Sequence, residues 1–111
     1  MSEQEQIRAA RNQTLYRLVN EKIESVNEAF TEALQMEGEW VCECADQACT
    51  EPMQMTLNEY EELRRHSNRF AALPGHVYPD VEEVVGETDR YVLVEKIGKG
   101  ADIAIETDPR G

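Results

Sequence analysis

The chain has 111 residues, of which 23 are Asp or Glu and 11 are Lys or Arg, so its net charge is −12. This length suits one domain with a modest core, which a bound metal ion would stabilise appreciably. The charge argues against direct binding of nucleic acid, because holding a phosphate backbone takes an excess of Lys and Arg. An acidic surface of this kind fits a solvated exterior, a basic protein partner, or a mimic of nucleic acid.

The cysteine count and the hydropathy indicate a cytoplasmic protein. The chain has three cysteines, an odd number that disulfides cannot fully consume. It has no signal-peptide pattern, and no apolar run approaches the roughly 18 residues that a membrane span needs. We therefore expect reduced thiols and no contact with a membrane.

Residues 1–38 are predicted to form a long N-terminal helix. Ser2 and Glu5 have the spacing of a capping box, and Gly38 would end the helix. A heptad stripe, typical of a coiled coil, runs through Tyr16, Val19, Ile23, Val26 and Phe30. A helix over residues 3–37 would be about 50 Å long, more than the remaining chain is expected to cover.

That length leaves alternatives for the helix. Its first turns fray before Thr14, where Asn12, Gln13 and Thr14 weaken it, or it projects and forms a homodimer through the heptad stripe, or the stripe over residues 15–34 packs on its own chain. The stripe alone does not decide between them.

Residues 39–100 are predicted to form a small α/β cap, which makes the fold class α+β. Strands are expected at residues 39–44, 53–57, 70–73 and 90–97, the last of them central in a short sheet. The capping box of Thr56 and Glu59 predicts the start of a helix, and residues 81–85 suit a short helical turn. Residues 101–111 are expected to be a disordered tail.

All the cysteines lie in the segment Cys42-Glu43-Cys44-Ala45-Asp46-Gln47-Ala48-Cys49, with the spacing C-x-C-x4-C. Strand alternation brings Cys42 and Cys44 to the same side, and the polar residues that follow suit a turn that returns Cys49. His76 follows the turn pair Pro74-Gly75 and is the expected fourth ligand, whereas His66 falls on a solvated helix face. Thiolates with one imidazole are the donors zinc prefers in closed sites, so we predict a structural Zn2+ held by Cys42, Cys44, Cys49 and His76.

Two other interpretations of the cysteines remain open. In the first, the cysteines are small hydrophobic residues buried in the core, although Glu43 and Asp46 make the segment polar. Alternatively they form a redox sensor, in which Cys42 and Cys44 join in a disulfide, or a zinc-thiolate centre releases its metal on oxidation. The neighbouring carboxylates would raise the thiol pKa values and slow that chemistry.

The chain resembles a group of small bacterial proteins whose function is uncharacterised. The resemblance rests on Val19-Asn20-Glu21, the segment 42–49, the segment 56–61, Pro74-Gly75-His76, and the strand 91–96, where Leu93 departs from the pattern. It covers about residues 10–98 and implies the same Cys3His ligands, but it implies no activity. The C-x-C spacing is also faintly similar to zinc-binding SWIM domains, whose closing Cys-x-His this sequence lacks.

The sequence offers no motif for catalysis. Gly98-Lys99-Gly100 lacks the later glycine of a phosphate-binding loop, and neither Gly-x-Ser-x-Gly nor His-Glu-x-x-His occurs. We therefore predict a non-enzymatic zinc-binding protein that acts as an interaction or regulatory module on a protein partner. The redox sensor and the acidic mimic of nucleic acid are the alternatives.

Overall fold

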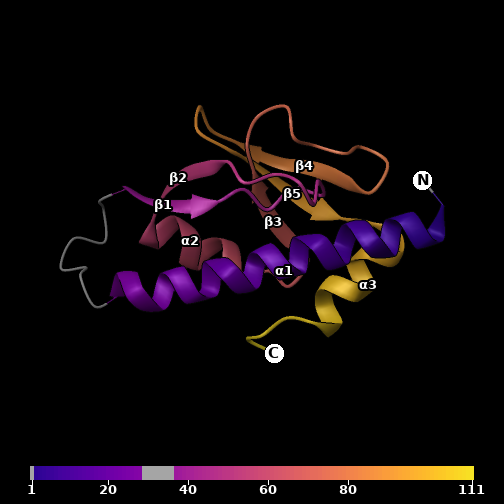
Figure 1. Ribbon diagram of the computed structural model, residues 1–111, viewed down its shortest axis with the longest axis horizontal. Helices are drawn as coiled ribbons and strands as arrows, with labels where there is room; N and C mark the ends of the chain where they lie inside the picture. The colour runs from indigo at the N-terminus through magenta and orange to yellow at the C-terminus, as the bar shows by residue number, and fades with distance from the viewer. Residues whose placement is uncertain (1, 29–36) are drawn as a thin grey trace.

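The structure, a computed structural model, describes residues 2–28 and 37–111, and the side chains of residues 26–28 and 37 are not among the described parts. Its fold is α+β, as predicted (Figure 1). The helices are α1 (Glu3–Glu28), α2 (Leu57–Arg64) and α3 (Gly98–Glu106). The strands are β1 (Glu37–Val41), β2 (Pro52–Thr56), β3 (Arg69–Ala72), β4 (Glu82–Glu87) and β5 (Val92–Lys96).

Helix α1 runs along the length of the molecule (Figure 1). The predicted capping box is confirmed: the amide of Glu5 donates to Ser2 Oγ at 3.1 Å, and the amide of Ser2 donates to Glu5 Oε1 at 3.3 Å. The predicted helix from 29 to 36 lies outside the described residues. Gly38 was wrongly expected to end the helix; it lies in β1 opposite Met55, where strand pairing supplies its backbone partners.

The strands form separate antiparallel sheets. One pairs β1 with β2, and the other has the order β3-β5-β4, so the predicted central position of β5 is confirmed. The helical turn predicted for residues 81–85 is wrong, because β4 occupies this stretch. Val84 pairs with Val94, and a bulge between Val84 and Gly86 accommodates the irregular spacing that resembled a helical turn.

The capping box of α2 and an aromatic stack fix the core of the cap. Thr56 Oγ1 accepts from the amide of Glu59, whose carboxylate accepts from the amide of Thr56. Trp40 stacks on Tyr60 with ring centroids 4.1 Å apart, inside a cluster that includes both methionines of β2. A second cluster joins the cysteines to Phe70, Val94 and other apolar side chains of β3, β5 and α3.

Helix α1 packs on its own chain, but mainly through a polar face and not through the apolar stripe, and it is continuous from Glu3, so the expected fraying before Thr14 is wrong. The buried face carries polar side chains, namely Gln13, Thr14, Arg17, Asn20 and Glu24. Of the heptad stripe, Tyr16 and Ile23 contact the same chain, Val19 is 40% exposed, and the side chains of Val26 and Phe30 lie outside the described residues.

Residues 98–106 form α3, so the disordered tail expected from residue 101 onward is wrong. Small residues let α3 pack closely against α1 and β5. A Cβ added to Gly100 would lie 2.9 Å from Lys96 Cε and 3.5 Å from Ala10 Cβ. Arg17 donates to the carbonyl of Ala104 at 2.9 Å. Arg110 fastens the end of the chain to α1 and α2, with ion pairs to Glu21, Glu24 and Glu61.

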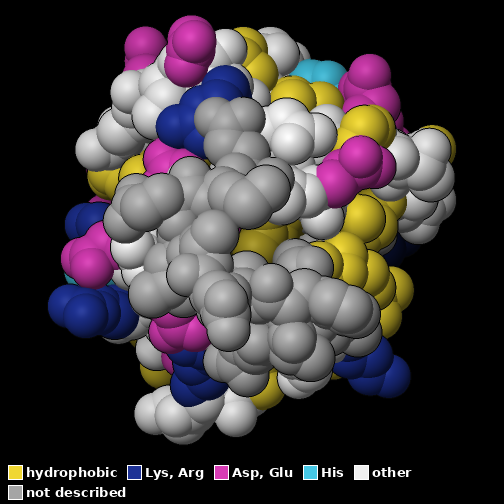
Figure 2. Space-filling model, turned by 90° about the vertical axis from the view of Figure 1, so that its left-hand side faces the viewer, with side chains coloured by type: hydrophobic (Ala, Val, Ile, Leu, Met, Phe, Trp, Pro, Cys, Tyr) yellow, Lys and Arg dark blue, Asp and Glu magenta, His cyan; other side chains and the backbone are white. Residues whose placement is uncertain are grey.

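Figure 2 looks onto the end of the molecule where α1 ends and β1 begins, and it shows charged side chains of both signs beside exposed hydrophobic ones. Within the described part of the chain, no helix combines the length and the apolar character that crossing a membrane requires.

Candidate metal centre

The structure brings together the four residues that the sequence singled out. The Sγ atoms of Cys42, Cys44 and Cys49 and a ring nitrogen of His76 lie within 4.8 Å of one another. Nδ1 of His76 lies 3.6 Å from Cys42 Sγ and 3.7 Å from Cys49 Sγ. These donors converge on one point between them, as the ligands of a single metal ion do.

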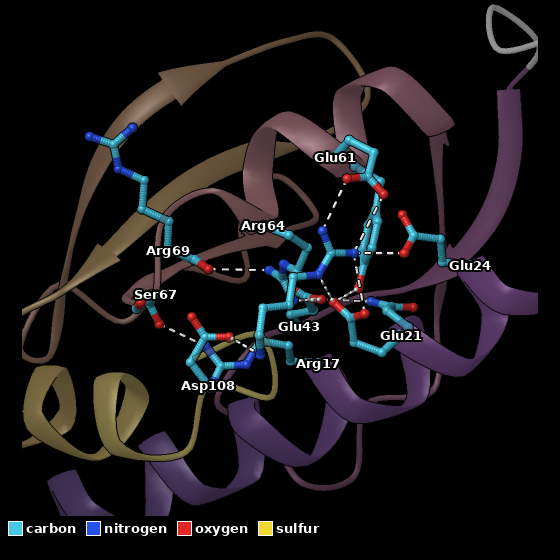
Figure 3. A network of polar contacts seen from close by, with 12 residues as sticks. Arg17, Glu21, Glu24, Glu43, Glu61, Arg64, Ser67, Arg69 and Asp108 are labelled. Carbon is cyan, nitrogen blue, oxygen red and sulfur yellow. Dashed lines mark hydrogen bonds and ion pairs between the residues drawn. The ribbon is translucent and has the colours of Figure 1, made fainter.

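Glu43 anchors the two cysteines that flank it. Its side chain is fully buried, although β1 ends at Val41 and the strand predicted for residues 39–44 therefore stops before Cys42. Arg64 donates to its two oxygens at 3.0 and 2.8 Å, and Asn20 and the amide of Ala71 donate at 2.7 and 3.1 Å (Figure 3). These four hydrogen bonds hold the backbone from which Cys42 and Cys44 extend.

Arg64, which lies behind the thiols, stays charged. Burial alone would lower the pKa of Arg64, but the Glu43 carboxylate and further acceptors outweigh it and raise that pKa. Because Glu43 is neutralised by Arg64, it does not act as the uncompensated acidic neighbour of the thiols that the sequence suggested. The expectation that residues 42–49 are a polar loop is also corrected, because Glu43 is part of the core.

The loop that returns Cys49 is held by its own turn and by α1. Asp46 Oδ1 accepts from the amide of Ala48 at 2.9 Å, and the amide of Cys49 donates to the carbonyl of Asp46 at 3.0 Å. Tyr16 Oη lies 2.6 Å from the carbonyl of Cys49 and within 3.2 Å of the carbonyl of Asp46. Asn12 of α1 donates to the carbonyl of Cys44 at 3.3 Å. The long helix therefore supports the cysteine segment directly.

A tight turn presents His76 to the thiols. Gly75 has φ of 88°, a conformation that favours glycine, and the amide of His76 donates to the carbonyl of Leu73 at 3.0 Å. The amide of Leu73 in turn donates to Cys42 Sγ at 3.2 Å, which ties the turn to the first cysteine. His66 is exposed at the end of α2 and is outside the cluster, as predicted.

Glu51 holds the other side of the histidine ring. Its Oε2 lies 3.1 Å from His76 Nε2, while Nδ1 faces the sulfur atoms. A carboxylate on the outer ring nitrogen fixes the tautomer and the orientation of a metal-binding histidine, and it makes the inner nitrogen a better donor to the metal. The contact therefore leaves the lone pair of Nδ1 free to bind a metal ion.

The protein environment stabilises one of the three thiols as a thiolate. The hydrogen bond between Cys42 and Cys44, followed by burial, raises the pKa of Cys42. The same hydrogen bond lowers the pKa of Cys44, and burial raises the pKa of Cys49. A metal ion among the thiols would favour their deprotonated forms, because it compensates the charge that burial disfavours.

Sequence reasoning missed the residues that support this centre. Gln13 was expected to weaken the helix and Asn20 was given no structural role, yet both are buried, and Gln13 bridges the carbonyl of Glu43 to Glu82. Lys96 is also buried and lies 2.6 Å from Gln13 Oε1 and 3.5 Å from Glu82 Oε1. The available signal was the recurrence of polar residues at positions 13, 17, 20 and 24, which share one helix face.

No family model matches the chain, and no curated protein or solved structure matches it either. The site is therefore interpreted from its own geometry.

Proposed function

We propose that Cys42, Cys44, Cys49 and His76 bind one Zn2+ ion as a structural site, and that the protein is a non-enzymatic interaction or regulatory module. The observation that carries this proposal is the convergence of four donors within 4.8 Å of one another. Three sulfurs and one imidazole nitrogen are a donor set that favours zinc over the harder cations magnesium and calcium.

The distances support a tetrahedral ion. Zinc lies about 2.3 Å from sulfur and about 2.0–2.1 Å from nitrogen, so tetrahedral angles put these ligand atoms about 3.6 Å apart. The two separations from His76 Nδ1 to sulfur are 3.6 and 3.7 Å. These two separations match those of a zinc site, and all four donor atoms lie within 4.8 Å of one another.

A site with four protein ligands has no position left for a substrate or an activated water, which favours a structural role over a catalytic one. Burial also favours that role over redox sensing. Cys42 and Cys44 are 1% exposed and Cys49 is 8% exposed, so an oxidant reaches their sulfur atoms poorly. The proposed contribution of the metal is to hold the cysteine segment, the turn at His76 and helix α1 together.

Removing the metal tests this role. We expect a zinc chelator at neutral pH to release one zinc per chain and to abolish the cooperative thermal unfolding transition, because structural zinc stabilises small domains by about 10 kcal/mol or more. Added zinc should restore the transition. Release of no zinc, with an unchanged melting temperature, would contradict the proposal.

A further inference from the structure

Helix α1 exposes a surface that differs in charge from the rest of the molecule. Between residues 7 and 25 its exposed side chains are Arg8, Arg11, Leu15, Leu18, Val19, Lys22 and Ser25, and they include no carboxylate. The acidic residues of α1 within this span, Glu21 and Glu24, turn instead toward Arg110. The net charge of the chain is −12, so this surface is an exception.

The exposed residues form one ridge. Positions 8, 11, 15, 18, 22 and 25 follow alternating steps of three and four, which keeps them on one side of the helix over about 25 Å. Leu15, Leu18 and Val19 are 58%, 45% and 40% exposed. At the N-terminal end of this α1 ridge, a hollow of about 300 Å3 is lined by Gln4, Ile7, Arg8 and Arg11.

The cations of the α1 ridge form no ion pair with the described side chains, although Arg8 lies near Glu5, whose pKa is lowered by hydrogen bonds from Ser2 and, to a smaller extent, by the charge of Arg8. Elsewhere Arg17, Arg64 and Lys96 are buried, and Arg65, Arg90 and Arg110 form ion pairs. Arg8, Arg11 and Lys22 are exposed and have no ion pair among the side chains that the structure describes, and Lys99 on α3 is similar. Three such cations therefore lie along one apolar ridge.

We propose that the α1 ridge binds an amphipathic helix of another protein whose apolar positions are flanked by Asp or Glu. The leucines and the valine would bury apolar area against the partner, and the flanking carboxylates would meet Arg8, Arg11 and Lys22. Spacing by threes and fours suits helix-on-helix packing. The proposal names a partner class for the interaction role proposed above, and it does not depend on which metal the centre binds.

A second copy of this chain fits the α1 ridge less well. Antiparallel pairing about Leu15 would bring Arg8 close to Lys22 of the other copy, and parallel pairing would bring identical cations together. Like charges across an interface oppose association. Charge complementarity therefore favours an acidic helix of a different protein.

Binding of a synthetic helical peptide tests the proposal. The probe has leucine at the a and d positions of its heptads and glutamate at e and g, and a second peptide has lysine at e and g. Fluorescence anisotropy on the metal-loaded protein should show the glutamate peptide binding on the order of tenfold more tightly than the lysine peptide, with the difference shrinking in high salt. The thermal melt of the same sample reports whether the fold and the metal centre are intact. An intact melt without peptide binding would contradict the proposal for the α1 ridge alone, and a melt that shows no bound metal would contradict the proposed zinc site.

Matched variants locate the binding surface. Lys22→Glu and Lys99→Glu change the net charge equally, but only Lys22 lies on the α1 ridge. We expect Lys22→Glu to weaken binding of the glutamate peptide on the order of tenfold and Lys99→Glu to leave it nearly unchanged. Equal affinity for both peptides, no binding of either, or equal losses in the two variants would overturn the proposal. So would a dimer in sedimentation that Leu15→Glu dissociates, or binding to anionic vesicles in place of the peptide.

Discussion

Glu51 is the residue whose role beside the metal centre is most open to direct test. Its carboxylate lies 3.1 Å from Nε2 of His76 but is 61% exposed, so it contributes little to the core. We expect Glu51→Gln to weaken zinc affinity about tenfold, because losing such a carboxylate partner typically costs 10- to 100-fold. Competition with a chelating dye measures the change.

The control for Glu51 is another exposed acid away from the centre. Glu62 is 66% exposed and, among the described side chains, its ion pair is with the neighbouring Arg65. Glu62→Gln should leave zinc affinity unchanged, and an equal loss in both variants would show that the effect comes from net charge and not from orienting His76.

Glu43 should be costly to change although it binds no metal. Removing its charge leaves Arg64 buried with an uncompensated charge, which typically costs about 3–5 kcal/mol. We expect Glu43→Gln to lower the free energy of unfolding by about that amount in denaturant titrations. In the double variant Glu43→Gln with Arg64→Met, the loss should be smaller than the sum of the single losses. Additive losses would contradict the anchoring role.

At the scale of elements, one carboxylate joins α2 to the segment that leads into β5. Glu59 closes the capping box of α2 and also accepts from Arg90 at 2.8 Å and from Tyr91 Oη at 2.6 Å. The hydrogen bond from Arg90, helped by Tyr91 and the amide of Thr56, lowers the pKa of Glu59 from 4.5 to about 2. The ionised form is therefore the one that stabilises the fold.

The pH dependence of Glu59→Gln follows from that shift. Since the folded pKa is below the unfolded value, the stabilisation is present above pH 4.5 and is lost as the pH falls toward about 2. We expect the variant to lose about 1–2 kcal/mol at pH 7, and the difference from the natural chain to shrink between these limits. Denaturant titrations of both proteins at each pH measure the difference. A gap that is constant with pH would contradict the assigned pKa shift.

Elements whose signals are local were predictable from the sequence. Both capping boxes and the central strand β5 form as expected, because spacing and alternation specify them directly. Helix α3 and strand β4 were missed, because their signals depend on contacts with distant segments. Gly98 and Gly100 resemble a turn until α1 supplies the small side chain of Ala10 against which Gly100 packs. Strand β4 likewise depends on pairing with β5.

The same distinction applies to the metal centre. Residue chemistry and spacing were enough to identify the four donors, because few side chains bind zinc. The supporting residues were hidden, because Asn20 and Gln13 become partners of the site only when the helix meets the cap, and Glu51 only when the turn at His76 folds back on the cysteine segment. Asn12 and Gln13 were taken as signs of a weak helix, whereas their side chains donate to backbone carbonyls of the cap.

For the molecule as a whole, the acidic charge and the buried cations belong together. The chain uses several of its few cations inside, where Arg17, Arg64 and Lys96 are buried, and this leaves most of the exterior acidic. A basic partner or a mimic of nucleic acid remains a prediction for that exterior, while the α1 ridge is proposed for an acidic helix. Binding of a basic partner to the acidic exterior and binding of an acidic helix to the α1 ridge should both weaken in high salt, and the charge of the partner that binds distinguishes the two surfaces.

The metal content of protein purified without added metal tests the central claim most directly. The measurement compares the natural chain with His76→Ala and with His66→Ala, in which the exposed histidine at the end of α2 is changed. We predict about one zinc per chain in the natural protein and in His66→Ala, and little or none in His76→Ala. No metal in the natural chain, with three titratable thiols in a folded protein, would contradict the account.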